Sequence, residues 1–118
     1  MRAEETVRQF FDRVNARDLS GLGALLEKDA IFFFPKTQPL SGRDRILRFF
    51  RVLFRQYPSL VFDVKRTIIQ GPWAAVHWTN KGESRHGDPY ENEGMTLLHL
   101  EGTRVRFISD FFKDTEKF

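Results

Sequence analysis

The sequence predicts one α+β domain over residues 1–118, in which three helices lie on one side of a strongly curved, mostly antiparallel sheet. Three observations predict this fold class. In the first half, apolar residues recur at spacings of three and four, as on the buried side of a helix. After Pro58 they alternate with polar residues, as in strands. Near the end, two such strands flank Glu101-Gly102-Thr103, where glycine suits the positive φ that a tight turn usually needs.

The first two helices are predicted over Ala3–Ala16 and Leu19–Leu26. The apolar side of the first helix is formed by Val7, Phe10, Phe11 and Val14. Asp18 has the residue type and position of an N-cap for the second helix. A short apolar strand, Ala30–Phe34, follows and is ended by Pro35. Its continuous apolar run predicts burial on both faces, or a pocket on one face.

A third helix is predicted over Arg43–Tyr57, after the loop Pro35–Gly42 and before Pro58. Ser41 is the expected capping residue. Apolar residues cover most of the circumference, which predicts that this is the buried helix. The remaining stripe of Arg48, Arg51 and Arg55 is more typical of a solvated helix face than of a phosphate-binding surface.

Four antiparallel strands are predicted for the second half of the chain. They are Leu60–Gln70, Trp73–Lys81, Tyr90–Leu100 and Arg104–Phe112. Gly71-Pro72 forms the first turn, and a polar loop, Gly82–Gly87, leads into the final hairpin.

Composition excludes several classes of function. The chain has 13 Phe and 2 Trp, which suits either a plain aromatic core or a greasy cavity. It has 0 Cys, so disulfides and thiolate metal sites are excluded. A net charge of +3, without a basic tail or a Cys/His finger, predicts no binding of nucleic acid. The absence of a leader-like start and of a membrane-spanning apolar run predicts a cytoplasmic protein that does not contact membranes.

No motif for a cofactor or a metal is present. The sequence contains no glycine-rich phosphate loop and no serine-nucleophile elbow. Glu91 and Glu93 have the spacing of paired carboxylates on one strand face, but no nearby histidine or aspartate completes a metal set. We therefore expect a protein that works without cofactor or metal.

Short pieces in a fixed order carry a family resemblance over nearly the whole chain. The pieces are Phe10-Phe11, Asn15 to Leu19, Asp29 to Pro35, Leu40 to Asp44, Val76 to Trp78, Gly102, and Phe107 to Phe112. They resemble the cystatin-like α+β cone shared by nuclear transport factor-like proteins, ketosteroid isomerase, limonene-epoxide hydrolase and SnoaL-like polyketide cyclases. The resemblance implies a single SnoaL-like domain, in which a cone-shaped sheet wraps around the three helices. It also implies an apolar pocket lined by Phe10, Val14, Phe32, Phe34, Phe50, Phe54, Trp78 and Leu98.

The catalytic positions of these families are mostly replaced. By the resemblance, Phe10 and Phe34 occupy the tyrosine and general-base positions of ketosteroid isomerase, and its second acid falls near Thr96. A phenyl ring neither abstracts a proton nor donates to an enolate, so isomerase chemistry of that type is not expected. Phe32 and Phe34 likewise replace the tyrosine and asparagine of epoxide hydrolase. Asp110 alone has a counterpart, both there and in the pocket aspartate of SnoaL-like cyclases.

Asp110 and His77 are the candidate catalytic residues. Aromatic walls around Asp110 would raise the pKa of its carboxyl and suit it to proton transfer. The structural alternative is that Asp110 caps backbone amides or pairs with an arginine. His77 could complete an acid–base pair. If Trp78 lines the pocket, however, alternation places His77 on the other face, as a surface or interface residue.

Further polar positions follow from the same alternation. Tyr90 and Asn92 share the face of Thr96 and Leu98, so they could hydrogen-bond a ligand at the mouth of the cone or simply face solvent. Met95, Leu97 and His99 lie on the outer face, which predicts a homodimer surface.

Two functions remain open. The first is binding of a small hydrophobic molecule, with cofactor-free isomerisation, cyclisation or hydrolysis by Asp110. The second is a non-catalytic ligand-binding or dimeric interaction module. An open cavity that reaches Asp110 would favour the first, and a filled cone the second.

Overall fold

The computed structural model describes residues 2–117, which form three α-helices and one curved six-stranded sheet. The helices are α1 (Arg2–Ala16), α2 (Leu19–Leu25) and α3 (Arg43–Gln56), with a 3-10 turn, η1 (Thr115–Lys117). The strands are β1 (Leu26–Phe33), β2 (Leu40–Ser41), β3 (Val61–Gln70), β4 (Trp73–Glu83), β5 (Pro89–Glu101) and β6 (Arg104–Phe112). The order across the sheet is β2-β1-β6-β5-β4-β3. All neighbouring pairs are antiparallel except β1 and β6, which are parallel.

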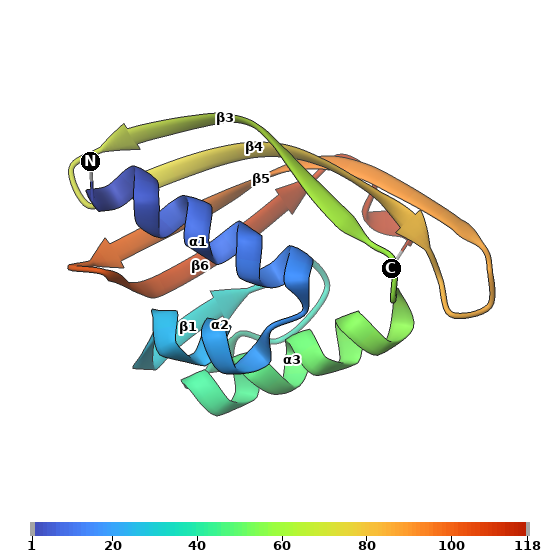
Figure 1. The fold of residues 1–118 in the computed structure, drawn as a ribbon, viewed down its shortest axis with the longest axis horizontal. Coiled ribbons are helices and arrows are strands. Elements are labelled where there is room, and N and C mark those ends of the chain that lie inside the picture. The colour runs from blue at the N-terminus through green and yellow to red at the C-terminus, as the bar shows by residue number, and fades with distance from the viewer. Residues whose placement is uncertain (1, 118) are drawn as a thin grey trace.

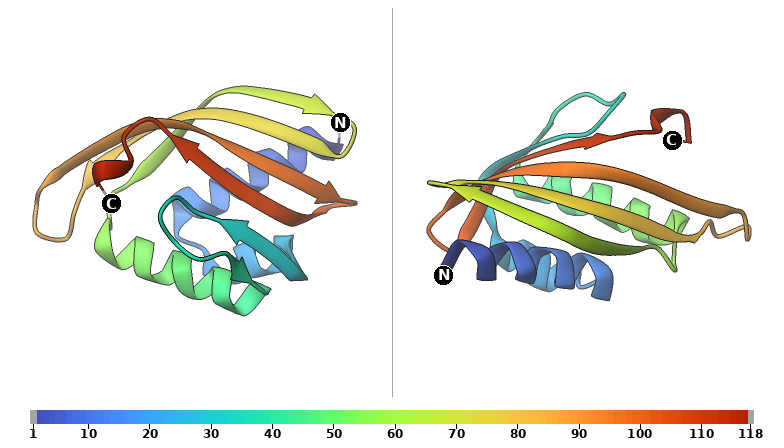
Figure 2. Two further views of the ribbon diagram at one scale, coloured as in Figure 1. Left: turned by 180° about the vertical axis from the view of Figure 1, so that it is seen from behind. Right: turned by 90° about the horizontal axis from the view of Figure 1, so that it is seen from above.

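The sheet arches over the helices, so its concave face forms one wall of the core (Figures 1 and 2). α1 packs beside β3, α3 packs beside β1, and α2 joins the two helices. The α+β fold class, the three helices and the curved sheet are confirmed. A single hydrophobic cluster contains residues from all three helices and from four of the strands, so the described residues share one core.

Three local details differ from the sequence prediction. β1 begins at Leu26, directly after α2, and is irregular between Leu26 and Ile31. Part of the predicted loop pairs with β1 as the short strand β2. Ser41 is in that strand rather than at a cap, so the predicted capping role is wrong. Gly42 is the N-cap of α3, with a φ of 100° that favours glycine and without a side-chain hydrogen bond.

Two other expectations about the helices have opposite outcomes. Asp18 is confirmed as the N-cap of α2, because its Oδ1 accepts a hydrogen bond of 2.9 Å from the amide of Gly21. α3 was expected to be the buried helix, and this is wrong. Only Ile46 and Phe50 are buried in it, while Val52 is 40% exposed. α3 packs against β1 and α2 with one side, and the rest of its surface is accessible to solvent.

Glycine permits the strong curvature of the sheet at one central point. Gly94 on β5 pairs with Trp78 on β4 and with Phe112 on β6. A Cβ atom at this position would lie 2.7 Å from the Cβ of Phe112 and would clash with the backbone oxygen of Phe111. The close approach of β6 to β5 therefore requires glycine here.

Strict alternation on β4 and β5 separates two faces. The concave face carries the buried residues Ala74, Val76, Trp78, Asn80, Tyr90, Gly94, Thr96, Leu98 and Leu100. The outer face carries the residues between them. The predicted assignment of Trp78 to the inside and of Met95, Leu97 and His99 to the outside is confirmed.

Candidate functional site

A small cavity lies inside the cone, between α3 and strands β3 to β6. Its volume is about 30 Å³, which is room for a water molecule and not for a drug-sized ligand. Its apolar lining consists of Phe34, Phe49, Phe50, Leu53, Leu60, Phe62, Trp78 and Phe112. The polar residues among its lining are Asn80, Tyr90 and Asp110. Each comes from a different strand, and all three project from the concave face.

Asp110 is held by a short chain of hydrogen bonds. The indole Nε1–H of Trp78 donates to Thr96 Oγ1 at 2.8 Å, and Thr96 Oγ1 donates to Asp110 Oδ1 at 2.6 Å. An indole nitrogen can only donate, so the threonine hydroxyl must accept from it and direct its own proton at the carboxyl. The register produces this arrangement, because Thr96 on β5 is directly opposite Asp110 on β6. These hydrogen bonds fix one carboxyl oxygen of Asp110, and Thr96 does not contact the other oxygen.

The surroundings of Asp110 change its acidity. Burial among the rings disfavours the charged carboxylate and raises the pKa of Asp110 to about 7, while the hydrogen bond from Thr96 opposes this shift. Near neutral pH both forms of the carboxyl are therefore populated, as acid–base catalysis requires. Tyr90 is also affected. Burial raises the pKa of its phenol to about 12, so at neutral pH it is neutral.

Partly exposed rings separate the cavity from solvent. Phe34 contacts Phe49 and Phe112, with ring centroids 4.7 Å and 5.4 Å apart. All three rings line the cavity and are only partly buried. We refer to these three rings as the aromatic cover.

Five predicted site residues line the cavity together: Phe34, Phe50, Trp78, Tyr90 and Asp110. The other predicted apolar residues belong to the core rather than to the cavity wall, which corrects the expected lining. Phe10, Val14, Phe32 and Leu98 are fully buried in the hydrophobic cluster, and Phe54 packs against it. The reason is that the rings fill the cone themselves. Phe32 stacks on Phe50 at 5.8 Å, and Phe10 contacts the same ring edge-on at 6.2 Å.

Asn92 and Thr96, both predicted to bind a ligand, have structural hydrogen bonds instead. Asn92 Nδ2 donates to the hydroxyl of Tyr90 at 3.1 Å and to the carbonyl of Asp114 at 2.8 Å, and its Oδ1 accepts from the amide of Asp114 at 3.1 Å. It therefore fastens the segment after β6 to β5. Thr96 directs its hydroxyl proton to Asp110. Neither residue is among those that line the cavity.

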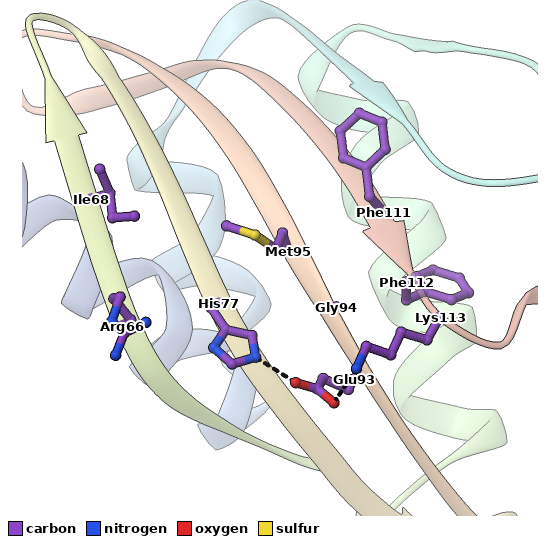
Figure 3. A pocket seen from close by; sticks show the side chains of 9 residues that line it. All are labelled: Arg66, Ile68, His77, Glu93, Gly94, Met95, Phe111, Phe112 and Lys113. Carbon is purple, nitrogen blue, oxygen red and sulfur yellow. Dashed lines mark hydrogen bonds and ion pairs between the residues drawn. The ribbon is translucent and has the colours of Figure 1, made fainter.

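His77 is not brought together with Asp110. It lies on the outer face of β4, where its Nε2 is 2.6 Å from Glu93 Oε2 (Figure 3). Lys113 Nζ contacts the other oxygen of Glu93 at 2.9 Å. The hydrogen bonds from His77 and then Lys113 lower the pKa of Glu93. The expected acid–base pairing of His77 with Asp110 is thus corrected, because alternation places the two side chains on opposite faces.

The outer face has the larger hollow of the two. This groove has a volume of about 510 Å³ and is lined by Arg66, Ile68, His77, Glu93, Gly94, Met95, Phe111, Phe112 and Lys113 (Figure 3). Glu93 is paired with His77 and Lys113, and all three side chains are accessible to solvent. Proton transfer in catalysis is favoured by desolvated groups, whereas these paired side chains are hydrated. They are therefore poorly suited to acid–base catalysis.

Asn80 is the polar cavity residue that sequence reasoning missed. It is 5% exposed, and its Oδ1 is buried without a hydrogen-bond partner among the described residues. Alternation from Trp78 places Asn80 on the concave face, so the sequence contained the signal. Phe49, Leu53, Leu60, Phe62 and Phe112 were missed as well. Their apolar types fit a core equally well, so no pattern distinguishes them as cavity residues.

Within residues 2–117, no three His, Asp or Glu side chains gather as metal ligands would. None of the helices in that range combines the length and the apolar character that crossing a bilayer demands.

Comparison with known proteins gives a consistent result. The family model for the SnoaL-like domain matches residues 7–108. No curated protein matches the sequence. Among solved structures, an NTF2-like protein of unknown function from Burkholderia pseudomallei K96243 has a TM-score of 0.89 at 20% identity, over 99% of this chain and 95% of that one.

Two further structures are similar over most of the chain. A proposed SnoaL-like polyketide cyclase from Jannaschia sp. CCS1 has a TM-score of 0.86 at 21% identity, over 95% of this chain and 85% of that one. A proposed ketosteroid isomerase from Kribbella flavida DSM 17836 has a TM-score of 0.80 at 27% identity, over 97% of this chain and 79% of that one.

Proposed function

The chain belongs to the SnoaL-like domain family, and from this premise we propose that it binds a small hydrophobic carbonyl compound in the cone and uses Asp110 for proton transfer. The observation that carries the proposal is the environment of Asp110. Its carboxyl faces an aromatic cavity, and burial raises its pKa to about 7. A group with a pKa near the working pH exchanges protons most effectively in both directions.

The proposed reaction needs no cofactor. The carboxylate of Asp110 takes a proton from the carbon next to the ligand carbonyl, and the electron pair of the broken C–H bond moves to form the enolate. The neutral acid then returns a proton to carbon. Thr96 holds Oδ1 at 2.6 Å, so the carboxyl keeps a fixed direction while the other oxygen acts as the base. This step is common to isomerisations and cyclisations of carbonyl compounds.

Ligand entry requires movement of the aromatic cover. The cavity volume of about 30 Å³ is far below the roughly 300–1,000 Å³ of pockets that enclose drug-sized ligands. Phe34, Phe49 and Phe112 are partly exposed, and a change of their side-chain rotamers would enlarge the cavity without unfolding any strand. We infer that the ligand displaces these rings as it binds.

Exchange of carbon-bound hydrogen tests the proposal directly. In D₂O, the protein should accelerate deuterium incorporation at the acidic carbons of 2-tetralone, measured by NMR against a protein-free control. The rate should rise with pH through about 7, where Asp110 ionises. Asp110→Asn keeps an oxygen that can accept from Thr96, so it should fold and show only the background rate. Equal acceleration by the wild type and Asp110→Asn would overturn the assignment of Asp110.

The small cavity favours a second candidate function. With about 30 Å³ of free space, the cone is nearly filled by its own rings, as in a non-catalytic interaction module. In that case 2-tetralone would neither bind nor exchange, and the chemical shifts of cavity residues would not change on its addition. Addition of 2-tetralone, followed by the NMR signals of both the protein and the ligand, therefore separates the two functions.

We further propose that the outer face forms a homodimer. Ile68 and Phe111 are 56% and 58% exposed there, beside the partly buried Met95. Glu93 lies among basic groups in the same groove, so a second copy can meet it with charges of both signs. Exposed apolar side chains gathered on one sheet face are typical of an interface.

Sedimentation equilibrium tests this assembly. The wild type should have the mass of a dimer, and Phe111→Asp should have the mass of a monomer. Val52→Asp is the matched control, because Val52 is 40% exposed but lies on α3. A wild-type protein that stays monomeric at tens of micromolar would overturn the proposal.

A further inference from the structure

Asn80 differs from the other buried polar side chains of the cone. Its residue is 5% exposed and lines the cavity, yet its Oδ1 is buried without a hydrogen-bond partner among the described residues. Buried polar atoms are nearly always paired, because an unpaired one loses its contact with water and gains nothing in return. An unpaired acceptor that borders a cavity is the arrangement expected of a group that binds a ligand.

The comparison with other polar groups supports this interpretation. Thr96 and Asn92 have hydrogen bonds that explain their burial. Arg17 Nε is also buried without a partner, but the terminal nitrogens of the same guanidinium donate to the carbonyls of Asn15, Tyr57 and Leu60. Arg17 holds the end of α1 to the loop between α3 and β3 and is not among the residues that line the cavity. Among the described residues, no group of the protein provides such an explanation for Asn80.

Asn80 and Asp110 are well separated along the strand direction, although both line the cavity. Asp110 pairs with Thr96, and Thr96 pairs with Val76 on β4. Asn80 lies four residues further along β4 on the same face, which corresponds to about 13 Å of strand. Trp78 lies between them and contributes its indole to the same wall. An elongated ligand along this wall would therefore meet one polar group at each end.

The chemistry of the amide oxygen determines which ligand group fits. An amide oxygen accepts hydrogen bonds and cannot donate them, so it requires a donor. A cationic donor beside Asn80 would lose its hydration, and Asp110, the acidic residue of the lining, is offset from Asn80 by four residues along the strands, so a cation is disfavoured there. A neutral hydroxyl group meets the requirement, whereas a carbonyl or a methyl group leaves the oxygen unpaired.

We propose that Asn80 Oδ1 is a second anchoring point in the cone and accepts a hydrogen bond from a hydroxyl group of the ligand. This inference rests on the proposed ligand-binding function and narrows its substrate class. The substrate is an apolar carbonyl compound with a hydroxyl group at the end remote from the reacting carbonyl. Asn80 is then the residue that determines specificity, because analogues without the hydroxyl leave a buried oxygen unpaired.

Phenol and toluene are suitable probes, because they have nearly the same shape and differ in a hydroxyl against a methyl group. An apolar cavity without a free acceptor prefers toluene, since phenol must give up its hydrogen bonds with water. Dissociation constants would be measured by NMR titration of the full chain, using the indole N–H signal of Trp78. We expect phenol to bind at least tenfold more tightly than toluene to the wild type.

Variants of Asn80 and Asp110 show which of the two residues causes the preference for phenol over toluene. Asn80→Leu removes the acceptor at similar volume, and Asn80→Ala removes it without adding bulk, should the leucine not fold. Both should lose the preference for phenol and still bind toluene. Asp110→Asn should keep the preference, because Asp110 is separated from Asn80 along the strands.

The contrary outcomes are distinct. A phenol preference that is absent in the wild type, that survives in the Asn80 variants, or that disappears in Asp110→Asn would overturn the role of Asn80. In each of these cases toluene binding would leave the ligand-binding function standing. If neither probe binds to the wild type, the cone is closed to ligands, and both the proposed function and this inference fail.

Discussion

The two faces of the sheet use the same strands for opposite purposes. On β4 and β5 each residue that faces the cone is followed by one that faces outward. The inner face has a cavity of about 30 Å³ and partly buries one acidic side chain, Asp110, which lines that cavity with aromatic rings. The outer face has a groove of about 510 Å³ and carries a partly exposed cluster of His77, Glu93 and Lys113. The acidic residue in an aromatic environment therefore lies in the smaller cavity, not in the larger groove.

Burial rather than residue type decides how these acids behave. Asp110 and Glu93 both accept short hydrogen bonds from side chains of neighbouring strands. Desolvation dominates at Asp110 and raises its pKa, whereas hydrogen bonds from His77 and Lys113 dominate at Glu93 and lower its pKa. The carboxyl with the raised pKa, that of Asp110, is therefore distinguished by its desolvation and not by the number of its charged neighbours.

The largest effect should come from removing a tryptophan from one face or the other. Trp78→Ala deletes a ring that is 2% exposed and also removes the donor to Thr96, so it should lower the free energy of unfolding by about 3–5 kcal/mol. Trp73→Ala is the matched control at the start of the same strand, because Trp73 is 41% exposed on the outer face. Trp73→Ala should lower the free energy of unfolding by about 1 kcal/mol or less. Urea denaturation followed by circular dichroism measures both.

Similar losses for the two tryptophan variants would contradict the contrast between the faces. A large loss for Trp73→Ala that grows with protein concentration would instead assign Trp73 to the dimer contact, because subunit association stabilises the folded state. The comparison should therefore be made at two protein concentrations.

The next effect is the dependence of stability on pH that Asp110 introduces. Its pKa is 3.8 without the protein environment and about 7 in the folded state. The contribution of Asp110 to the free energy of unfolding is fully present below pH 4 and is lost as pH rises through 7. The reason is that this carboxyl ionises at a lower pH in the unfolded chain than in the folded protein. The loss amounts to at most about 4 kcal/mol, at about 1.4 kcal/mol per pH unit.

Asp110→Asn removes this dependence while it keeps an acceptor for Thr96. The variant should be more stable than the wild type at pH 8, and the difference should shrink or reverse by pH 4. Urea denaturation of both proteins at four pH values gives the slope, and contributions from all other groups cancel in the difference. A wild-type slope that matches the variant's would mean that Asp110 is hydrated or paired in the folded state.

Much of this arrangement follows from the sequence. Helical spacing located α1 to α3, alternation located β3 to β6, and alternation from Trp78 also showed which face each neighbour occupies. β2 was not predicted, because two residues give no periodicity and their strand exists only by pairing with Ile31 and Phe32. Ser41 fits a cap by type, but tertiary pairing draws it into that strand.

The candidate site was predicted less completely. Asp110 was found because an acid among aromatic residues is unusual, and its Thr96 contact could not be foreseen without the register of β5 and β6. Phe10 and Phe32 were expected to line a pocket, but a phenylalanine gives the same signal in a wall and in a core. Whether rings enclose space or fill it depends on rotamers and helix positions, which a sequence pattern does not contain. Asn80 was within reach of alternation and was overlooked.

The smallest effect should come from Glu93, and its sign should be opposite to that of Asp110. Hydrogen bonds from His77 and Lys113 lower the pKa of Glu93, so its contribution is present above its usual pKa of 4.5 and is lost as pH falls. Glu93→Gln should therefore be slightly less stable than the wild type at pH 7 and equal to it in strong acid. When the comparison is made in Phe111→Asp, the expected monomer, added salt should reduce the difference, because this carboxylate is then accessible to solvent and its ion pairs are screened. Urea midpoints at low and high salt measure it, and a salt-independent loss as large as that of Trp78→Ala would show that the outer face is desolvated in solution by a partner.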